Sequence, residues 1–274
     1  MSGIMNPKLK RPKTLEEHRE YLFEMVRLML FYTHLQLSEH PEESFRFVIR
    51  NRVDIYRKTD ANPGPLNPVD LHMDESPWLD MECQAEQCWQ AHKTNRTAFE
   101  AEAFEIFRPS IERRVFRDFH DDSVLKRYQC GCFRHDLQLK TPEERCLHFH
   151  IANDKTPDSL FEHPGHIREC LLKLCSVAEK DFGADQLGTF TWLNSYPRFL
   201  AFFPQEWRQN MGAENHDVGW GYGHWGQFIS ARGTYNRRHG DYFRQTGKMP
   251  FYPKSSRCRI AALRQFLDGA GPWS

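Results

Sequence analysis

The chain has 274 residues, which is enough for one large domain or two smaller ones with a substantial hydrophobic core. Its 37 basic and 37 acidic side chains give a formal net charge of zero, which argues against a nucleic-acid partner. No stretch approaches the roughly 20 apolar residues that span a bilayer, and the N-terminus lacks the pattern of a secretory signal. We therefore expect a cytoplasmic protein with reduced cysteines, a small-molecule substrate, and neither a nucleic-acid nor a membrane partner.

The first part of the chain has helical spacing of its apolar residues. Thr14 and Glu17 form a T-x-x-E capping box ahead of the first such pattern. Further helices are predicted over residues 41–57 and 77–107, with Pro109 expected to interrupt the second of them. The stretch "KTDANPGPLNPVD" between them predicts a loop. We expect a helical N-terminal domain over residues 1–120.

From about residue 122 the apolar period changes to two. A strand pair is predicted by "LKRYQCGCFRHDLQLK" and "RCLHFHIAN", followed by an amphipathic helix that ends at Gly183. Next come a strand, "QLGTFTWLN", and a short helix that begins at Pro197. A strand-like run, "VGWGYGHWGQFIS", and two helices, "NRRHGDYFRQTG" and "RCRIAALRQFLDG", complete the pattern. This order predicts an α/β (α+β) sheet domain over residues 121–274.

Two histidines, His148 and His150, share one face of the strand that also contains Leu147 and Phe149. Such a pair can bind iron, zinc, copper or nickel. It also suits metal-free acid–base chemistry, or a structural role with one imidazole hydrogen-bonded and the other solvated. A third metal ligand would come from one of the following residues: His135, Asp154, Glu162, His163, His216, His224 or His239.

The cysteines suggest a second hypothesis. Cys83 and Cys88, together with Cys130 and Cys132, could form a four-thiolate zinc site. Their spacings fit poorly with those of structural zinc sites, so packed thiols are the better interpretation.

Polar residues follow the strand "QLGTFTWLN". Trp192, Asn194, Ser195, Tyr196 and Arg198 stand at or beyond its carboxyl end, where ligands bind in open α/β sheets, and are candidates for substrate binding. Ser195 lacks the G-x-S-x-G elbow of a hydrolase nucleophile.

A glycine-rich segment supplies one more candidate. His224 lies in "GWGYGHWGQF", where alternating glycines would let a flat ligand approach the backbone. We therefore count it among the substrate-binding candidates.

The order of four segments resembles the catalytic half of GNAT-like acyltransferases, in a group with a helical N-terminal domain. The segments are "RYQCGCFRHDLQL", "CLHFHIAND", "TPDSLFEHPGHIRECLLKL" and "TFTWLNSYPRFLAFFP", and the resemblance covers roughly residues 125–230. The chain departs from the family where a glycine pair usually holds the pyrophosphate of acyl-CoA, since "NDKTPDSLFEHPGHI" has no such pair.

The resemblance implies a GNAT-like fold, with a mixed sheet, and transfer of an acyl group from acyl-CoA or another thioester to a small amine or hydroxyl. It implies that His148 or His150 is the base and Tyr196 the acid for the leaving thiol, with Asn194 and Arg198 beside the substrate. Two alternatives stay open: a mononuclear iron or zinc enzyme with its metal on His148 and His150, and a non-catalytic protein that binds a small molecule.

Overall fold

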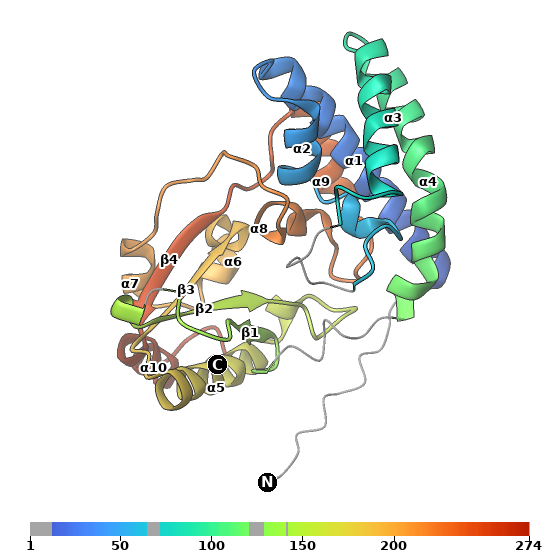
Figure 1. Cartoon of the computed structure of the whole chain (residues 1–274). Coiled ribbons are helices and arrows are strands. Elements are labelled where there is room, and N and C mark those ends of the chain that lie inside the picture. The colour runs from blue at the N-terminus through green and yellow to red at the C-terminus, as the bar shows by residue number, and fades with distance from the viewer. Residues whose placement is uncertain (1–12, 65–71, 121–128, 141, 274) are drawn as a thin grey trace. The chain divides into compact units, whose positions relative to one another are not determined.

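The computed structural model shows a helical N-terminal region followed by a four-stranded mixed sheet with helices (Figure 1). The structure describes residues 13–64, 72–120, 129–140 and 142–273. These residues divide into two compact units. We call them the helical unit, with described residues between 13 and 120 and residues 217–250, and the α/β unit, with described residues between 129 and 216 and from 251 to 273.

The helical unit is built on two long helices that pack along each other, α1 and α4. A capping box begins α1, in which Glu17 N–H donates to Thr14 Oγ1 and Thr14 N–H donates to Glu17 Oε2. The α-helices described in this unit are α1 (Leu15–Glu39), α2 (Phe45–Asn51), α3 (Trp78–Ala91), α4 (Arg96–His120), α8 (Tyr222–Trp225) and α9 (Arg237–Thr246).

Three helix boundaries differ from the sequence-based expectation. The helix predicted over 41–57 is confined to α2 and a separate 3-10 turn, and the one predicted over 77–107 is two helices, α3 and α4. Pro109 does not end α4, because the residues on both sides of it form one buried stripe. The stripe consists of Phe104, Phe107, Ile111 and Val115.

The strand predicted in "VGWGYGHWGQFIS" is wrong, because this segment forms the single helical turn α8 and a 3-10 turn. Trp225 and Phe228, three residues apart, are both buried, so the side chains that pack have helical spacing. They pack on Tyr32 and Phe243, with ring centroids 5.6 Å apart for Tyr32–Trp225 and 5.7 Å apart for Phe228–Phe243. The alternation of glycines with larger residues in the sequence resembles the two-residue period of a strand, but the segment is not a strand.

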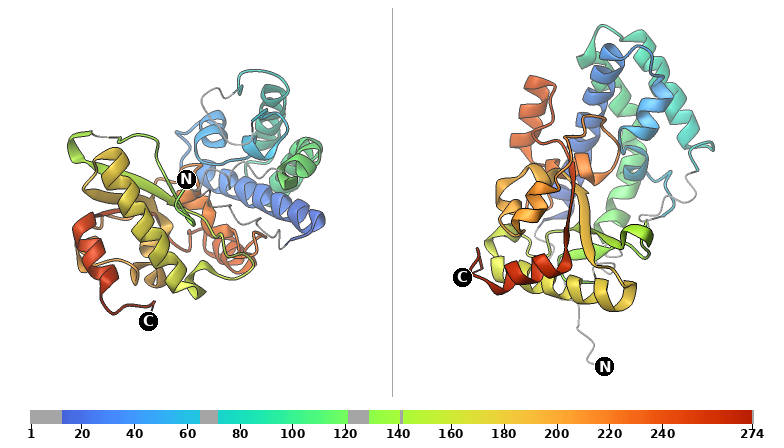
Figure 2. Two further views of the ribbon diagram at one scale, coloured as in Figure 1. Left: turned by 90° about the horizontal axis from the view of Figure 1, so that it is seen from below. Right: turned by 90° about the vertical axis from the view of Figure 1, so that its left-hand side faces the viewer.

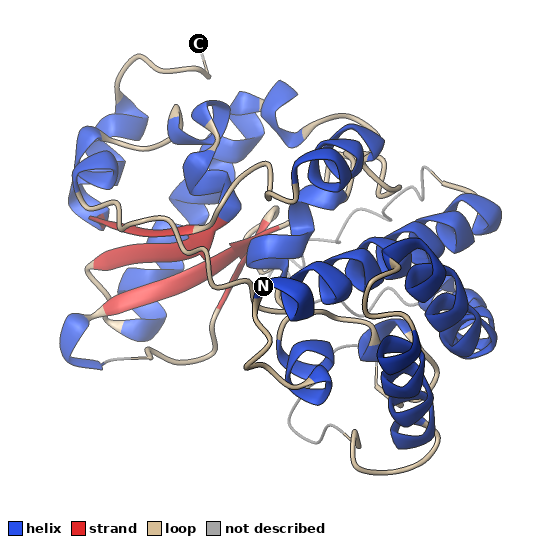
Figure 3. Cartoon of the chain, turned by 90° about the horizontal axis from the view of Figure 1, so that it is seen from above, coloured by secondary structure: helices blue, strands red, loops and turns tan. Residues whose placement is uncertain are grey.

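The α/β unit contains the four strands, in the spatial order β1-β2-β3-β4 (Figure 3). Strands β1 and β2 are antiparallel, β2 and β3 are parallel with α5 as the connection, and β3 and β4 are antiparallel. The strands and helices of this unit are β1 (Phe133–His135), β2 (Cys146–Ile151), α5 (Pro164–Phe182), β3 (Gln186–Thr191), α6 (Pro197–Leu200), α7 (Gln205–Gln209), β4 (Lys254–Arg259) and α10 (Ile260–Asp268).

Strand β4 was not predicted, since "RCRIAALRQFLDG" was assigned wholly to a helix. The first three residues of that segment, Arg257 to Arg259, instead belong to β4 and pair with Gly188 to Gln186 of β3. Helix α10 begins at Ile260. The predicted strand pair β1–β2, helix α5, strand β3 and the short helix at Pro197 are confirmed, with shorter strands. Of the first predicted strand, residues 125–128 lie outside the described residues and β1 is only Phe133–His135. Strand β3 ends at Thr191, and Trp192–Ser195 form a 3-10 turn.

One face of the sheet is buried and the other is more exposed. Leu147, Phe149, Leu187 and Cys258 belong to the core, which they form with buried side chains of α5 and α10. The two helices lie side by side (Figure 2). Of the residues that alternate with this core, His148 and His150 are partly exposed and Phe190 and Arg257 are exposed, whereas Cys146 and Gly188 are buried. Among the described residues no helix has the length and apolar character needed to cross a bilayer.

Gly183 ends α5 in the left-handed region, with φ 61°, and a Cβ added to it would have no atom within 4 Å apart from those of its chain neighbours. Gly183→Ala should therefore cost about 1–2 kcal/mol through backbone strain alone. Urea unfolding would measure the loss. Gly165→Ala is the matched control, because Gly165 lies in the same helix without positive φ and also has free space around it. Equal stability of Gly183→Ala and the native chain would contradict this account.

Candidate functional site

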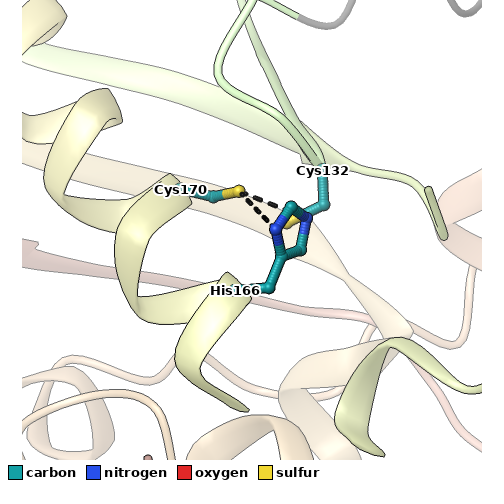
Figure 4. A group of neighbouring side chains, drawn as sticks. All are labelled: Cys132, His166 and Cys170. Carbon is teal, nitrogen blue, oxygen red and sulfur yellow. Dashed lines mark hydrogen bonds between the residues drawn. The ribbon is translucent and has the colours of Figure 1, made fainter. Parts of the chain in front are cut away.

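Two segments of the α/β unit bring two thiols and an imidazole together (Figure 4). Cys132 comes from the turn before β1, and His166 and Cys170 come from the first turns of α5. One ligand atom from each of the three residues lies within 4.8 Å of the other two. We call these residues the Cys132–His166–Cys170 group.

Local sequence explains each position. His166 and Cys170 are four residues apart, so they share one face of α5. Gly131 is at the tip of the turn that carries Cys132, with φ +65°, and a Cβ on Gly131 would lie 2.3 Å from Cys170 Sγ. A glycine is therefore required there both for the backbone conformation and for the approach of the Cys170 thiol.

A carboxylate fixes the imidazole. Asp154, in the turn after β2, places Oδ2 2.8 Å and Oδ1 3.0 Å from His166 Nε2. This contact assigns the ring proton to Nε2, which donates it to Asp154, and leaves the lone pair on Nδ1. Cys170 Sγ lies 3.9 Å from Nδ1 and 3.5 Å from Nε2.

The two thiols are electrostatically unequal. Burial, and then the contact with Cys170, raise the pKa of the Cys132 thiol well above its ordinary value. A hydrogen bond from Cys132 lowers the pKa of Cys170, against the opposing effect of burial. Cys170 is therefore the thiol of the pair that ionises first, and Cys132 supplies the proton that stabilises its thiolate.

The group can hold a soft or borderline metal ion. Thiolate and imidazole ligands suit zinc, and in a tetrahedral zinc site with bonds of about 2.3 Å to sulfur and about 2.0 Å to nitrogen the ligand atoms are about 3.5 Å apart. Cys170 Sγ is 3.9 Å from His166 Nδ1, slightly more than this value, and one ligand atom from each of the three residues lies within 4.8 Å of the other two. The thiols are buried and the imidazole is partly exposed, so solvent reaches the group from the side of His166.

The histidine pair predicted from the sequence lies on the other face of the sheet. Phe149 alternates with His148 and His150 and belongs to the core that α5 covers, so the two imidazoles point away from the Cys132–His166–Cys170 group. His150 Nε2 is 2.9 Å from Asp136 Oδ1. Within the described ranges, neither of the two groups suited to a metal contains His148 or His150.

The residues predicted at the end of β3 have mostly structural hydrogen bonds. Asn194 is buried, donates to the carbonyls of Lys254 and Thr189, and accepts from Trp207 Nε1. Ser195 Oγ donates to the Tyr252 carbonyl over 2.8 Å. These contacts join the end of β3 to its neighbours.

Three further candidates from that segment face aromatic neighbours. Trp192 stacks on Phe251, with ring centroids 5.8 Å apart, and Tyr196 contacts Phe161 at 5.5 Å. Arg198 donates to the Phe161 carbonyl over 3.3 Å. The segment that carries Phe161 also connects Asp154 to His166, so these residues come after the carboxyl end of β2, as Trp192, Tyr196 and Arg198 come after that of β3. Cys132 comes before β1, whose first residue, Phe133, pairs with Ile151 at the end of β2.

His224, the last of the predicted substrate residues, belongs to the helical unit, where it is buried and its Nδ1 accepts a hydrogen bond from Gly219. Of the cysteines in the four-thiolate hypothesis, Cys83 and Cys88 belong to the helical unit and Cys130 and Cys132 to the α/β unit. Among the described residues, Cys88 and Cys132 instead belong to two separate groups of possible metal ligands. Cys170 and His166 were missed, although the spacing H-x-x-x-C on an amphipathic helix was a usable signal.

Comparison with known proteins finds no matching family model, no similar curated protein and no similar solved structure.

His148, on the face of the sheet away from the Cys132–His166–Cys170 group, gives the stability of the α/β unit a pH dependence. Burial, and then the positive charge of Lys140, lower the pKa of His148 below 6.5, so the folded state keeps this imidazole neutral where the unfolded chain would protonate it. The free energy of unfolding should therefore fall as the pH falls through about 6.5 and stop falling below the folded-state pKa. In His148→Gln the slope of this free energy against pH should be shallower in urea titrations between pH 5 and about 8. An unchanged slope would contradict the assignment of a neutral His148.

Proposed function

We propose that the α/β unit binds one zinc ion through Cys132, His166 and Cys170 and is a mononuclear zinc enzyme that acts on a small molecule. The observation that carries the proposal is the convergence of two thiols and one imidazole within 4.8 Å. Two thiolates balance the charge of a divalent ion, and these ligand types favour zinc over magnesium or calcium.

The number of ligands supports an enzyme over a purely structural site. Structural zinc sites are closed by four protein ligands, whereas catalytic sites keep one position open. The group contains three ligand side chains among the described residues. Its place beyond the carboxyl end of β2, next to parallel β3, is where ligands bind in open α/β sheets. A zinc ion in such a site polarises a carbonyl or phosphoryl oxygen or activates a water molecule.

The residues around the group have distinct roles in this proposal. Asp154 holds the His166 ring by its Nε2–H and so leaves Nδ1 as the nitrogen that binds the ion. Cys170 and Cys132 release their protons when the ion binds, in that order, because Cys170 has the lower pKa. Gly131 lets the turn approach Cys170 closely enough to form the group.

The metal content of the full chain tests the proposal. Cys132→Ser and Cys170→Ser should each lose one equivalent of zinc relative to the native chain, and Asp154→Asn should bind that ion about 10- to 100-fold more weakly. Elemental analysis of protein purified without a histidine tag would measure the content. Cys175→Ser is the matched control, since Cys175 is also buried in α5 but is outside the group, and it should keep the native content, as should His148→Ala.

The same zinc content in the native chain and in Cys170→Ser would overturn the metal site. A second measurement tests the open position. After substitution with Co²⁺, added azide should change the visible spectrum of the native chain by entering the fourth coordination position. A spectrum that azide does not change would make the site structural and would overturn the enzyme part of the proposal.

Acyl transfer is a second candidate function, and the end of the backbone pairing between β2 and β3 at His148 and Gly188 favours it. Their pairing runs from Cys146↔Gln186 to His148↔Gly188, after which the Thr189 hydroxyl donates to the Phe149 carbonyl over 2.7 Å. Parallel strands that separate in this way are what the GNAT-like resemblance implies for thioester binding. The neutral imidazole of His148, at the point of separation, suits a general base.

Under this candidate, acyl-CoA should raise the thermal unfolding temperature of the full chain, because a ligand that binds only the folded state stabilises it. His148→Ala should lower the rate of acyl transfer about 10²- to 10⁴-fold while His150→Ala is tolerated. Differential scanning fluorimetry with short and long acyl-CoA would be the first measurement. Absence of a shift with every thioester would remove this candidate and leave the zinc enzyme unaffected.

A further inference from the structure

A second group of ligand side chains lies in the helical unit, where α3 meets α4. The two helices are joined by residues 92–95 and lie side by side (Figure 1). Cys88 and His92 are four residues apart at the C-terminal end of α3, so they share one face, and Glu102 faces them from the second turn of α4. One ligand atom from each lies within 4.8 Å of the other two.

An ion pair joins two of the three side chains of this group. His92 Nε2 is 2.9 Å from Glu102 Oε2, which positions the ring and the carboxylate at the same point. The Cys88 thiol is directed at α4, where Sγ donates to the Phe99 carbonyl over 3.9 Å, a long contact for a thiol. His92 is partly buried and Glu102 is largely exposed, so an ion can enter from the side of Glu102.

The geometry provides the reason to place an ion there. A thiol, an imidazole and a carboxylate from two neighbouring helices converge, with one ligand atom from each of Cys88, His92 and Glu102 within 4.8 Å of the other two. A divalent cation bound at this point would displace one proton from Cys88 and be neutralised by one thiolate and one carboxylate.

We propose that Cys88, His92 and Glu102 form a second metal site of this protein, independent of the Cys132–His166–Cys170 group and selective for zinc or a similar borderline divalent cation. One thiolate, one imidazole and one carboxylate favour such a cation over magnesium or calcium, which prefer oxygen ligands alone. The site ties α3 to α4, so its occupation stabilises the helical hairpin that the two helices form.

Titration of the chelator-treated full chain with Co²⁺ tests the proposal, because the thiolate-to-cobalt absorption reports each sulfur ligand. The native chain should bind two equivalents. Cys88→Ser should bind one and lose about one third of the thiolate absorption, since it removes one of three thiolates. His92→Ala should also bind one equivalent. The matched control is Cys83→Ser, an exposed cysteine of α3 outside the group, which should bind two.

The stoichiometries separate this site from the one in the α/β unit. One equivalent in the native chain that Cys88→Ser abolishes and Cys170→Ser retains would support this site and overturn the proposed function. One equivalent that Cys170→Ser abolishes and Cys88→Ser retains would do the reverse and overturn this inference. Native binding of no cobalt overturns both. Circular dichroism of Cys88→Ser and His92→Ala, whose side chains are only partly buried, checks that both variants fold.

Discussion

Burial of one face of the four-stranded sheet is the constraint on which the α/β unit depends. The side chains of four strand residues are removed from water on the face of the sheet that α5 and α10 cover: Leu147, Phe149, Leu187 and Cys258. Since side chains alternate along a strand, the same burial assigns the histidines of β2 to the other face. Helix α5 in turn presents its own apolar stripe to the sheet. The residues of its first turns, His166 and Cys170, thereby reach the turn before β1, where Cys132 lies.

Burial in the core does not by itself explain the pKa values of the two thiols in the Cys132–His166–Cys170 group. Cys130, Cys132 and Cys175 are buried in the same core and, like most buried cysteines, have a raised pKa because burial disfavours the thiolate. Cys170 differs, because the hydrogen bond from Cys132 lowers its pKa in spite of burial. A single cysteine with this property, beside an imidazole that a carboxylate orients, is what a metal site or a reactive thiol requires. Its lowered pKa therefore depends on a neighbour that is 38 residues away in the sequence.

The two candidate metal groups share one construction. In each, a helix supplies a cysteine and a histidine four residues apart, and a neighbouring element supplies the third ligand. The helix fixes the distance between the first two ligands, and only tertiary packing fixes the third. They differ in their charge and burial. The group in the α/β unit has two buried thiols, whereas the group in the helical unit has one thiol and a largely exposed carboxylate.

The spacing of apolar residues and the helix-capping residues in the sequence determined several elements of secondary structure. They are the helix that begins after the capping box at Thr14, the strand with its two histidines, the helix α5 that ends at a glycine, and the change from helices to a sheet. These are local properties, decided by backbone preferences and by which side chains alternate. The sequence could not decide that Pro109 lies inside a helix, that residues 217–250 belong with the helical unit, or that residues 254–259 complete the sheet. Each depends on packing against residues distant in the chain. The same holds for the Cys132–His166–Cys170 group, because a site is defined by distances between side chains, and only the folded core brings the turn before β1 to the start of α5.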